Sequence, residues 1–218
     1  MFLGHFAIAL GAKKAAPRAS LGTLVLAAQF ADLLWPVFLL LGWEQVRIVP
    51  GVTRVTPLDF VSYPYSHSLV AQLLWGLGLG LVYFALRRKA RAAVILAACV
   101  PSHWVLDYVA HRPDMPLSPG GARYGLGLWN SFPVTLVAEF GLFAIGIAFY
   151  VTVTSANDRI GKWGLWSMLI FLPLVYVASV VSPPPPNVQV IAMSALAMWL
   201  VVPWAAWADR HRSSGASR

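Results

Sequence analysis

The sequence predicts an all-α integral membrane protein with about six membrane-spanning helices. Of its 218 residues, 59% are hydrophobic and only 11% are charged, whereas a soluble domain carries about 25% charged residues. Its mean hydropathy is +0.69. A bilayer core about 30 Å thick is crossed by roughly 20 apolar residues in a helix. Six stretches of the chain have that length and composition, and we expect one transmembrane domain over residues 1–218.

The predicted spans are separated by segments that cannot continue a helix in hydrocarbon. They lie near residues 20–42, 66–86, 92–111, 131–153, 163–182 and 187–207. The intervening sequences include the basic run RRKAR at 87–91, the polar turn SANDRIGK at 155–162 and the proline run SPPPPN at 182–187. Proline lacks the amide donor of a helix interior and clashes with the preceding turn. The apolar segment 1–12 is too short to cross, so we expect a half-span that dips into the membrane.

The positions of the basic residues predict the orientation. Four groups of Lys and Arg fall on the same side if six spans alternate: Lys13, Lys14 and Arg18; Arg87 to Arg91; Arg159 and Lys162; and Arg210, Arg212 and Arg218. Short loops rich in Lys and Arg stay in the cytoplasm. We therefore expect both termini in the cytoplasm and loops 43–65 and 112–130 outside. The net charge of +8 then reflects topology and contact with membrane lipid, and it does not indicate nucleic acid binding.

The stretch SHWVLDYVAH, residues 102–111, carries the most informative polar residues. His103, Asp107 and His111 are spaced by four, which places them along one face of a helix. His103 lies roughly 18 Å along its helix from Arg91, at 1.5 Å per residue. A stripe of imidazole and carboxylate groups at this depth is typical of a functional site, because charged groups in a membrane are costly.

Four other segments each place an ionisable side chain in the middle-to-outer half of the membrane. Asp32 lies roughly 18 Å from the basic end of the first span, at the helical rise per residue. His5 lies in the half-span, His67 at the outer start of the second span, and Glu139 inside the fourth. Unpaired charge at this depth costs about 2.5–3.5 kcal/mol per residue. We therefore expect these groups to share one site.

Imidazole and carboxylate donors suit Zn²⁺ or another divalent transition metal. The expected metal ligands are His5, Asp32, His67, His103, Asp107 and His111. Asp107 could also bridge two ions as a catalytic carboxylate, while Glu139 could act as general base or orient a ligand. Two alternatives stay open for Glu139 and the stripe: Glu139 could pair with Arg123, and the stripe could serve helix packing alone. The single cysteine, Cys99, excludes a multi-cysteine zinc site, and no G-x-S-x-G motif is present.

The same motifs resemble those of a known family. The segments GHFAIAL (4–10), FADLLWP (30–36), YSHSL (65–69), SHWVLDYVAH (102–111) and MPLSPGG (115–121) are similar in order to those of bacterial inner-membrane proteins described as metal-dependent hydrolases, one of them LexA-regulated. The resemblance implies a bacterial inner (plasma) membrane location and the metal ligands His5, Asp32, His67, His103 and Asp107. The ligand order is also distantly similar to that of zinc-dependent phospholipase C, which implies phosphoester hydrolysis.

The chain departs from the family pattern at two places. The family often has a second Asp where this chain has Leu34, and VSYPY (61–65) replaces its H-R-G segment, with Ser66 in place of Thr. His111 and Arg112 are candidate substitutes for the missing groups.

We expect a membrane-embedded, metal-dependent hydrolase acting on a phosphoester or lipid-linked substrate, with Arg112 or Arg123 contacting phosphate. The alternative is a proton- or ion-coupled transporter or channel that uses the same Asp, His and Glu residues as a relay.

Overall fold

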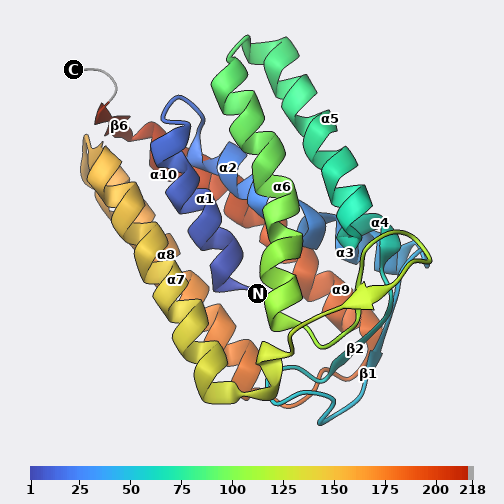
Figure 1. Cartoon of the computed structure of the whole chain (residues 1–218). Helices are drawn as coiled ribbons and strands as arrows, with labels where there is room; N and C mark the ends of the chain where they lie inside the picture. Colours follow the sequence, from blue (N-terminus) through green and yellow to red (C-terminus); the bar gives the residue numbers. More distant parts are fainter. Residues whose placement is uncertain (216–218) are drawn as a thin grey trace.

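Long apolar helices make up most of the computed structural model, which describes residues 1–215 (Figure 1). The helices are α1 (Leu3–Ala15), α2 (Leu21–Ala28), α3 (Phe30–Leu40), α4 (Pro64–His67), α5 (Leu69–Arg87), α6 (Ala90–Ala110), α7 (Phe132–Val153), α8 (Arg159–Val181), α9 (Val188–Leu196) and α10 (Val201–Arg210), with short 3₁₀ turns η1 (Leu128–Asn130) and η2 (Ala197–Leu200). Three antiparallel pairs of short strands join loops: β1 (Gln45–Ile48) with β2 (Leu58–Ser62), β3 (Met115–Pro116) with β4 (Arg123–Tyr124), and β5 (Thr154–Ala156) with β6 (Arg212–Ser214).

Five helices among the described residues are long and apolar enough to cross a membrane. They are α5, α6, α7, α8 and the continuous segment Val188–Arg210 formed by α9, η2 and α10. The pair α2 and α3 passes the same test together but is bent by 56°. The chain is therefore mostly helical, with five helices long and apolar enough to cross a membrane, or six such units if the bent pair counts as one.

The bend in the first predicted span is the main difference from the sequence-based expectation of one helix over 20–42. The helix breaks at Gln29, which ends α2 and precedes α3. At this break the carbonyl of Ala28 accepts a hydrogen bond from His103 Nδ1 of α6, 2.9 Å away. The break thus connects the backbone to the polar face of α6, a tertiary contact that hydropathy cannot indicate.

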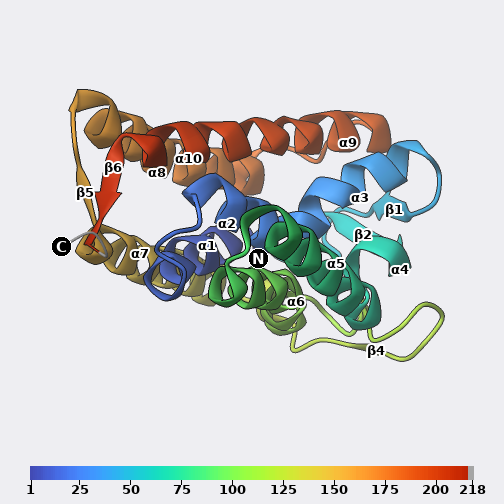
Figure 2. The same cartoon turned by 90° about the horizontal axis from the view of Figure 1, so that it is seen from above.

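The short helix α1 lies inside the bundle, with the start of the chain in its interior (Figures 1 and 2). It packs mainly against α7 and also against α2 and α6. Close approach to α7 depends on Gly146, because a Cβ there would lie 2.6 Å from Cα of Ala7. At 1.5 Å per residue, the 13 residues of α1 span about 20 Å, which is too short to cross a bilayer core. This length agrees with the predicted half-span.

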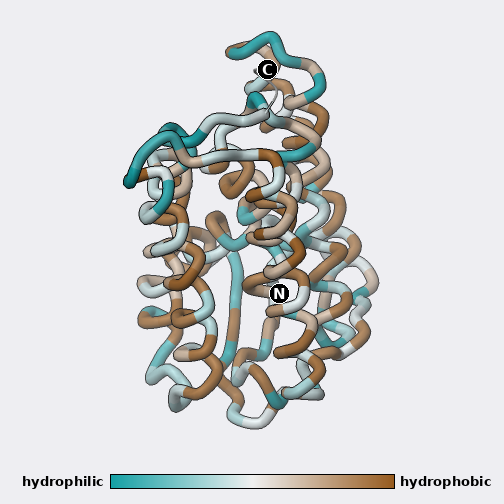
Figure 3. Tube along the Cα trace, turned by 90° about the vertical axis from the view of Figure 1, so that its left-hand side faces the viewer, coloured by the Kyte–Doolittle hydropathy of each residue, from teal (hydrophilic) through white to brown (hydrophobic). Residues whose placement is uncertain are grey.

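The two ends of the bundle differ in composition. Figure 1 places the α1–α2 and α5–α6 connections, β6 and the C-terminal end of α7 at one end, and β1, β2 and the loop after α6 at the other. Within residues 1–215, the four basic groups named above lie at the first end. Figure 3 shows strongly hydrophilic stretches at this end, apolar residues along the long helices, and further hydrophilic stretches at the opposite end. Large apolar side chains such as Leu74, Val137 and Val181 are 65–74% exposed on these helices, as expected for surfaces facing lipid.

A buried ion pair ties four helices together at the basic end. Lys13 Nζ lies 2.7 Å from Asp209 Oδ2, and the same oxygen accepts from the backbone N–H of Leu21 at 3.0 Å. Tyr150 donates to the other oxygen of Asp209 at 2.6 Å. Since every polar atom of the carboxylate is used, this cluster fixes α1, α2, α7 and α10 relative to one another.

Candidate metal site

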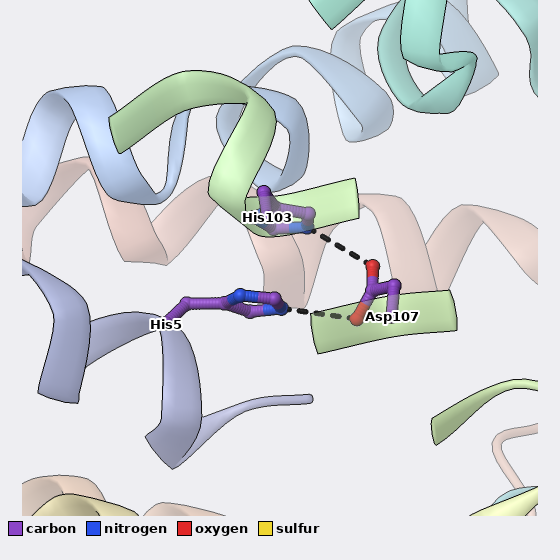
Figure 4. Close-up of side chains that lie close together, drawn as sticks. All are labelled: His5, His103 and Asp107. Atoms are coloured by element: carbon purple, nitrogen blue, oxygen red, sulfur yellow. Dashed lines mark hydrogen bonds and ion pairs between the residues drawn. The ribbon is translucent and has the colours of Figure 1, made fainter. Parts of the chain in front are cut away.

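The polar face of α6 forms the centre of the site. His103 and Asp107 are four residues apart, and Nε2 of His103 lies 3.2 Å from Oδ2 of Asp107. His5 of α1 approaches the same carboxylate from the other side, with Nε2 3.1 Å from Oδ1 (Figure 4). The rings of His5 and His103 are stacked with their centroids 3.5 Å apart. All three side chains are at most 2% exposed.

Asp32 and His67 complete the arrangement from α3 and α4. Oδ1 of Asp32 lies 3.4 Å from Nε2 of His67 and 3.6 Å from Nε2 of His103. Nε2 of His67 is also 3.9 Å from Oδ2 of Asp107. Asp32 keeps 26% of its side chain exposed, whereas His67 is buried. Asp32 is therefore the member of the site that is open to the surroundings.

The structure brings five of the six predicted metal ligands into two overlapping groups. One comprises His5, His103 and Asp107, and the other comprises Asp32, His67 and His103. Within each group the potential ligand atoms lie within 4.8 Å of one another. The bend between α2 and α3 brings Asp32 to the polar face of α6, and the single turn of α4 brings His67 there. Sequence spacing alone could not predict these two contacts.

The hydrogen bonds of His103 determine which of its nitrogens can bind a cation. Its Nδ1 lies 2.9 Å from the carbonyl oxygen of Ala28, which can only accept. Nδ1 must therefore carry the proton, and in a neutral ring Nε2 has a free lone pair. That Nε2 is buried without a hydrogen-bond partner, facing oxygens of Asp32 and Asp107. Lone pairs that face one another in this way repel unless a proton on the imidazole or a metal cation lies between them.

His67 is oriented by a chain that ends at Glu44. The hydroxyl of Ser66 lies 2.6 Å from Oε2 of Glu44 and 2.7 Å from Nδ1 of His67. Oε1 of Glu44 accepts from the backbone N–H groups of Tyr65 and Ser66. With the hydroxyl donating to Glu44, Ser66 accepts from Nδ1–H of His67, and Nε2 is left free toward the site. Carboxylates that orient a metal-binding histidine in this way are common outside the ligand shell.

Sequence reasoning missed the role of Glu44. Glu44 follows directly after the apolar segment that ends at Trp43, and it is only 2% exposed. No regular spacing relates it to Ser66, 22 residues away. The one signal was a carboxylate beside a predicted span, which by itself does not indicate a contact with a histidine.

The donor chemistry of the residues in the two groups suits a zinc-type ion. Around Zn²⁺ with ligands at about 2.0–2.1 Å, neighbouring donor atoms lie roughly 3.4 Å apart. The separations among the facing atoms of Asp32, His67, His103 and Asp107 include 3.2, 3.4, 3.6 and 3.9 Å. Two imidazole nitrogens and two carboxylate oxygens are donors that zinc accepts. Each of the two groups could therefore hold a metal ion, and Asp107 lies beside the group formed by Asp32, His67 and His103.

His111, the sixth predicted ligand, lies at the edge of the site. Its Nε2 is 3.9 Å from Oδ2 of Asp107, while its Nδ1 is 2.9 Å from Asp114. Tyr63 donates to the same Asp114 carboxylate at 3.2 Å. Burial, reinforced by the charge of Asp114, raises the pKa of Tyr63. His111 thus belongs to a neighbouring network and falls outside both compact groups.

The two predicted phosphate contacts lie in the loop and strand after α6. Arg112 forms ion pairs with Asp59 and, through Nε at 3.1 Å, with Asp114. Arg123 donates to the carbonyl of Val61 at 2.7 Å and lines a small cavity of about 190 Å³. The structure does not place either guanidinium in contact with the ligand groups. Both lie on the side of the bundle that holds loops 43–65 and 112–130.

Glu139, predicted as general base or orienting group, holds the start of α1. Its Oε1 accepts from the backbone N–H of Phe2 and its Oε2 from that of Gly4, both at 2.9 Å. Carboxylates are favourable at a helix N-terminus, where backbone N–H groups lack helical partners. Glu139 thereby fixes the segment that carries His5, and it does not pair with Arg123. Beside it the amino group of Met1 contacts the Asp107 carboxylate.

No family model, curated protein or solved structure matches this chain. The resemblance of its motifs to the bacterial inner-membrane hydrolases therefore stays a prediction.

Proposed function

We propose that this protein is a membrane-embedded, metal-dependent hydrolase whose ion is bound by Asp32, His67, His103 and Asp107. The observation that carries the proposal is the unpartnered Nε2 of His103. It faces two carboxylates while its Nδ1 is tied to a carbonyl. A zinc-type ion would satisfy the lone pair of the imidazole and the charge of Asp32, and it would share the Asp107 carboxylate with the amino group of Met1.

The residues of the chain have distinct proposed roles. When bound, Zn²⁺ would supply a Lewis acid and, with a water as a fifth ligand, would lower the pKa of that water to about 7. Asp107 presents one oxygen to His103 and the other to His5, so it couples the two sides of the site. Glu44 orients His67 through Ser66. Glu139 of α7 holds the start of α1, and with it His5, in place.

The proposed substrate class is a phosphoester or a lipid-linked phosphate. Three features support it: the depth of the site within apolar helices, the exposure of Asp32, and the guanidinium groups of Arg112 and Arg123 in the loop beyond α6. Arg112 is half-exposed, and a phosphate could exchange for one of its two carboxylate partners. In this proposal the basic end faces the cytoplasm of a bacterial inner membrane and the site opens toward the opposite leaflet.

Metal analysis of purified full-length protein tests the proposal. We expect about one equivalent of zinc on the wild type and loss of the metal in His103→Ala and Asp107→Ala. His211→Ala is the matched control, since His211 lies at the basic end and pairs with Asp158. A wild type without stoichiometric metal, or site variants that retain it as the control does, would overturn the assignment.

A second function is favoured by one observation, the discontinuity between α2 and α3 next to Asp32. Broken helices beside intramembrane carboxylates are typical of ion-coupled transporters. In that case, purified protein in liposomes would conduct protons without bound metal, and Asp32→Asn would abolish the flux. Absence of flux from metal-loaded wild-type protein would leave the hydrolase as the better explanation.

A further inference from the structure

A large cavity lies on the outside of α1, between α6 and α7. Its volume is about 710 Å³. Small and apolar residues line its length, among them Gly11, Ala98 and Ile145. Ile145 is 54% exposed, so the cavity is a groove open to the apolar exterior of the bundle. It extends from Gly4, beside the metal site, to the basic end of α1.

Two cations line the basic end of this groove. Lys14 lies at the end of α1 and Arg91 at the beginning of α6. Nζ of Lys14 is 5.2 Å from the centre of the Phe149 ring, which also lines the groove. Both cations are exposed. Among residues 1–215 no carboxylate forms an ion pair with either cation, and none lines the groove, so this positive charge is uncompensated.

The length of the groove corresponds to one leaflet. Lys14 and Gly4 are ten residues apart on α1, a distance of about 15 Å along the helix. This is half of the roughly 30 Å hydrocarbon thickness of a bilayer. A groove that is apolar over the depth of one leaflet and cationic at the headgroup level matches a phospholipid with negative charge in both its shape and its charge.

We propose that this groove binds one anionic phospholipid from the leaflet at the basic end. Lys14 and Arg91 contact its phosphate, and an acyl chain lies along α1 between α6 and α7. This proposal does not rest on the hydrolase, because the phosphate position is separated from His5 by most of α1. The bound lipid would cover the exposed side of α1, a helix too short to span the membrane by itself.

Native mass spectrometry of the full chain in detergent tests the proposal, with phosphatidylglycerol and phosphatidylcholine as probes. We expect one phosphatidylglycerol to bind more tightly than phosphatidylcholine. The double variant Lys14→Gln/Arg91→Gln should weaken phosphatidylglycerol binding about 25-fold, fivefold for each charge, which corresponds to about 1 kcal/mol per basic residue. Arg87→Gln/Lys89→Gln is the matched control, because it removes two charges at the same end but outside the groove.

A groove-filling variant separates headgroup attraction from seating of the chain. Ala98 is exposed within the groove, so Ala98→Leu occupies chain volume without changing charge and is expected to weaken binding of phosphatidylglycerol. Glycerol phosphate, which has the headgroup charge without chains, should not compete. Equal losses in the groove and control double variants, or unchanged binding by Ala98→Leu, would overturn the proposal. Zinc content should stay at the wild-type value in all these variants, whichever result is obtained.

Discussion

Replacing Ser66 by alanine tests how the proposed metal site depends on groups that are not among its proposed ligands. The Ser66 hydroxyl makes hydrogen bonds of 2.6 Å to Glu44 and 2.7 Å to His67. All three side chains are at most 3% exposed, so water cannot readily replace the lost contacts. Ser66→Ala leaves a buried carboxylate oxygen and Nδ1 of His67 without partners, and it removes the constraint on the tautomer of His67.

The expected effect is a decrease in zinc affinity of 10- to 100-fold, the range typical for removal of a group that orients a metal ligand. This corresponds to about 1.4–2.7 kcal/mol of binding free energy. Competition with a chromophoric chelator in detergent measures it. The stoichiometry should stay at one, because Asp32, His103 and Asp107 are unchanged.

Ser68→Ala provides the matched control two residues away. The Ser68 hydroxyl accepts from the N–H of Ala71 at the start of α5 and donates to the carbonyl of Pro64. Loss of this cap should lower the free energy of unfolding by about 1 kcal/mol and leave zinc affinity unchanged. If Ser66→Ala binds zinc as tightly as the wild type, or if both variants lose affinity equally, the orienting role assigned to Ser66 is wrong.

Three further predictions concern stability. Asp209→Asn leaves the buried ammonium of Lys13 uncompensated and should cost about 3–5 kcal/mol, seen as a large decrease in Tm; a change below 1 kcal/mol would contradict the structural role of this pair. Gly146→Leu should cost about 1–3 kcal/mol or more by separating α1 from α7, and an unchanged denaturation midpoint would argue against their close packing. The hydrogen bond from the backbone N–H of Gly161 lowers the pKa of Asp158 from its ordinary value of 3.8. The stability that Asp158 adds is therefore present above pH 3.8 and is lost as the pH falls through the lower pKa of the folded state. Asp158→Asn should remove this acid dependence in thermal melts between about pH 2.5 and 5, and identical pH profiles of variant and wild type would refute the assignment.

Much of the architecture could be predicted because membrane helices depend on local composition. Charge runs and prolines ended the predicted spans close to the observed ends, as at Arg87 and Val153. The spacing of His103 and Asp107 indicated a shared helix face, since the helical period alone determines it. The break at Gln29 was not predictable in the same way. It accompanies a hydrogen bond between Ala28 and α6, 75 residues later in the chain.

The residues that meet in the candidate site were largely predictable, and the groups that support them were less so. An ionisable side chain deep in an apolar helix is conspicuous because it is costly there, and this signal identified Asp32 and Glu139. It could not distinguish a ligand from a helix cap, and Glu139 binds backbone N–H groups of α1. Glu44 gave no such signal because it lies at the end of an apolar segment. Its contact with Ser66 depends on how two loops pack.

X-ray absorption spectroscopy at the zinc edge, on protein purified with its metal, tests the metal centre most directly. The proposed donor set predicts a shell of nitrogen and oxygen ligands at about 2.0–2.2 Å, four from the protein and one from water, with the outer-shell scattering of two imidazoles and no sulfur ligand. His103→Ala should remove one imidazole contribution or the metal itself. A spectrum dominated by water oxygens without imidazole scattering, or one with a sulfur ligand near 2.3 Å, would contradict a site formed by Asp32, His67, His103 and Asp107.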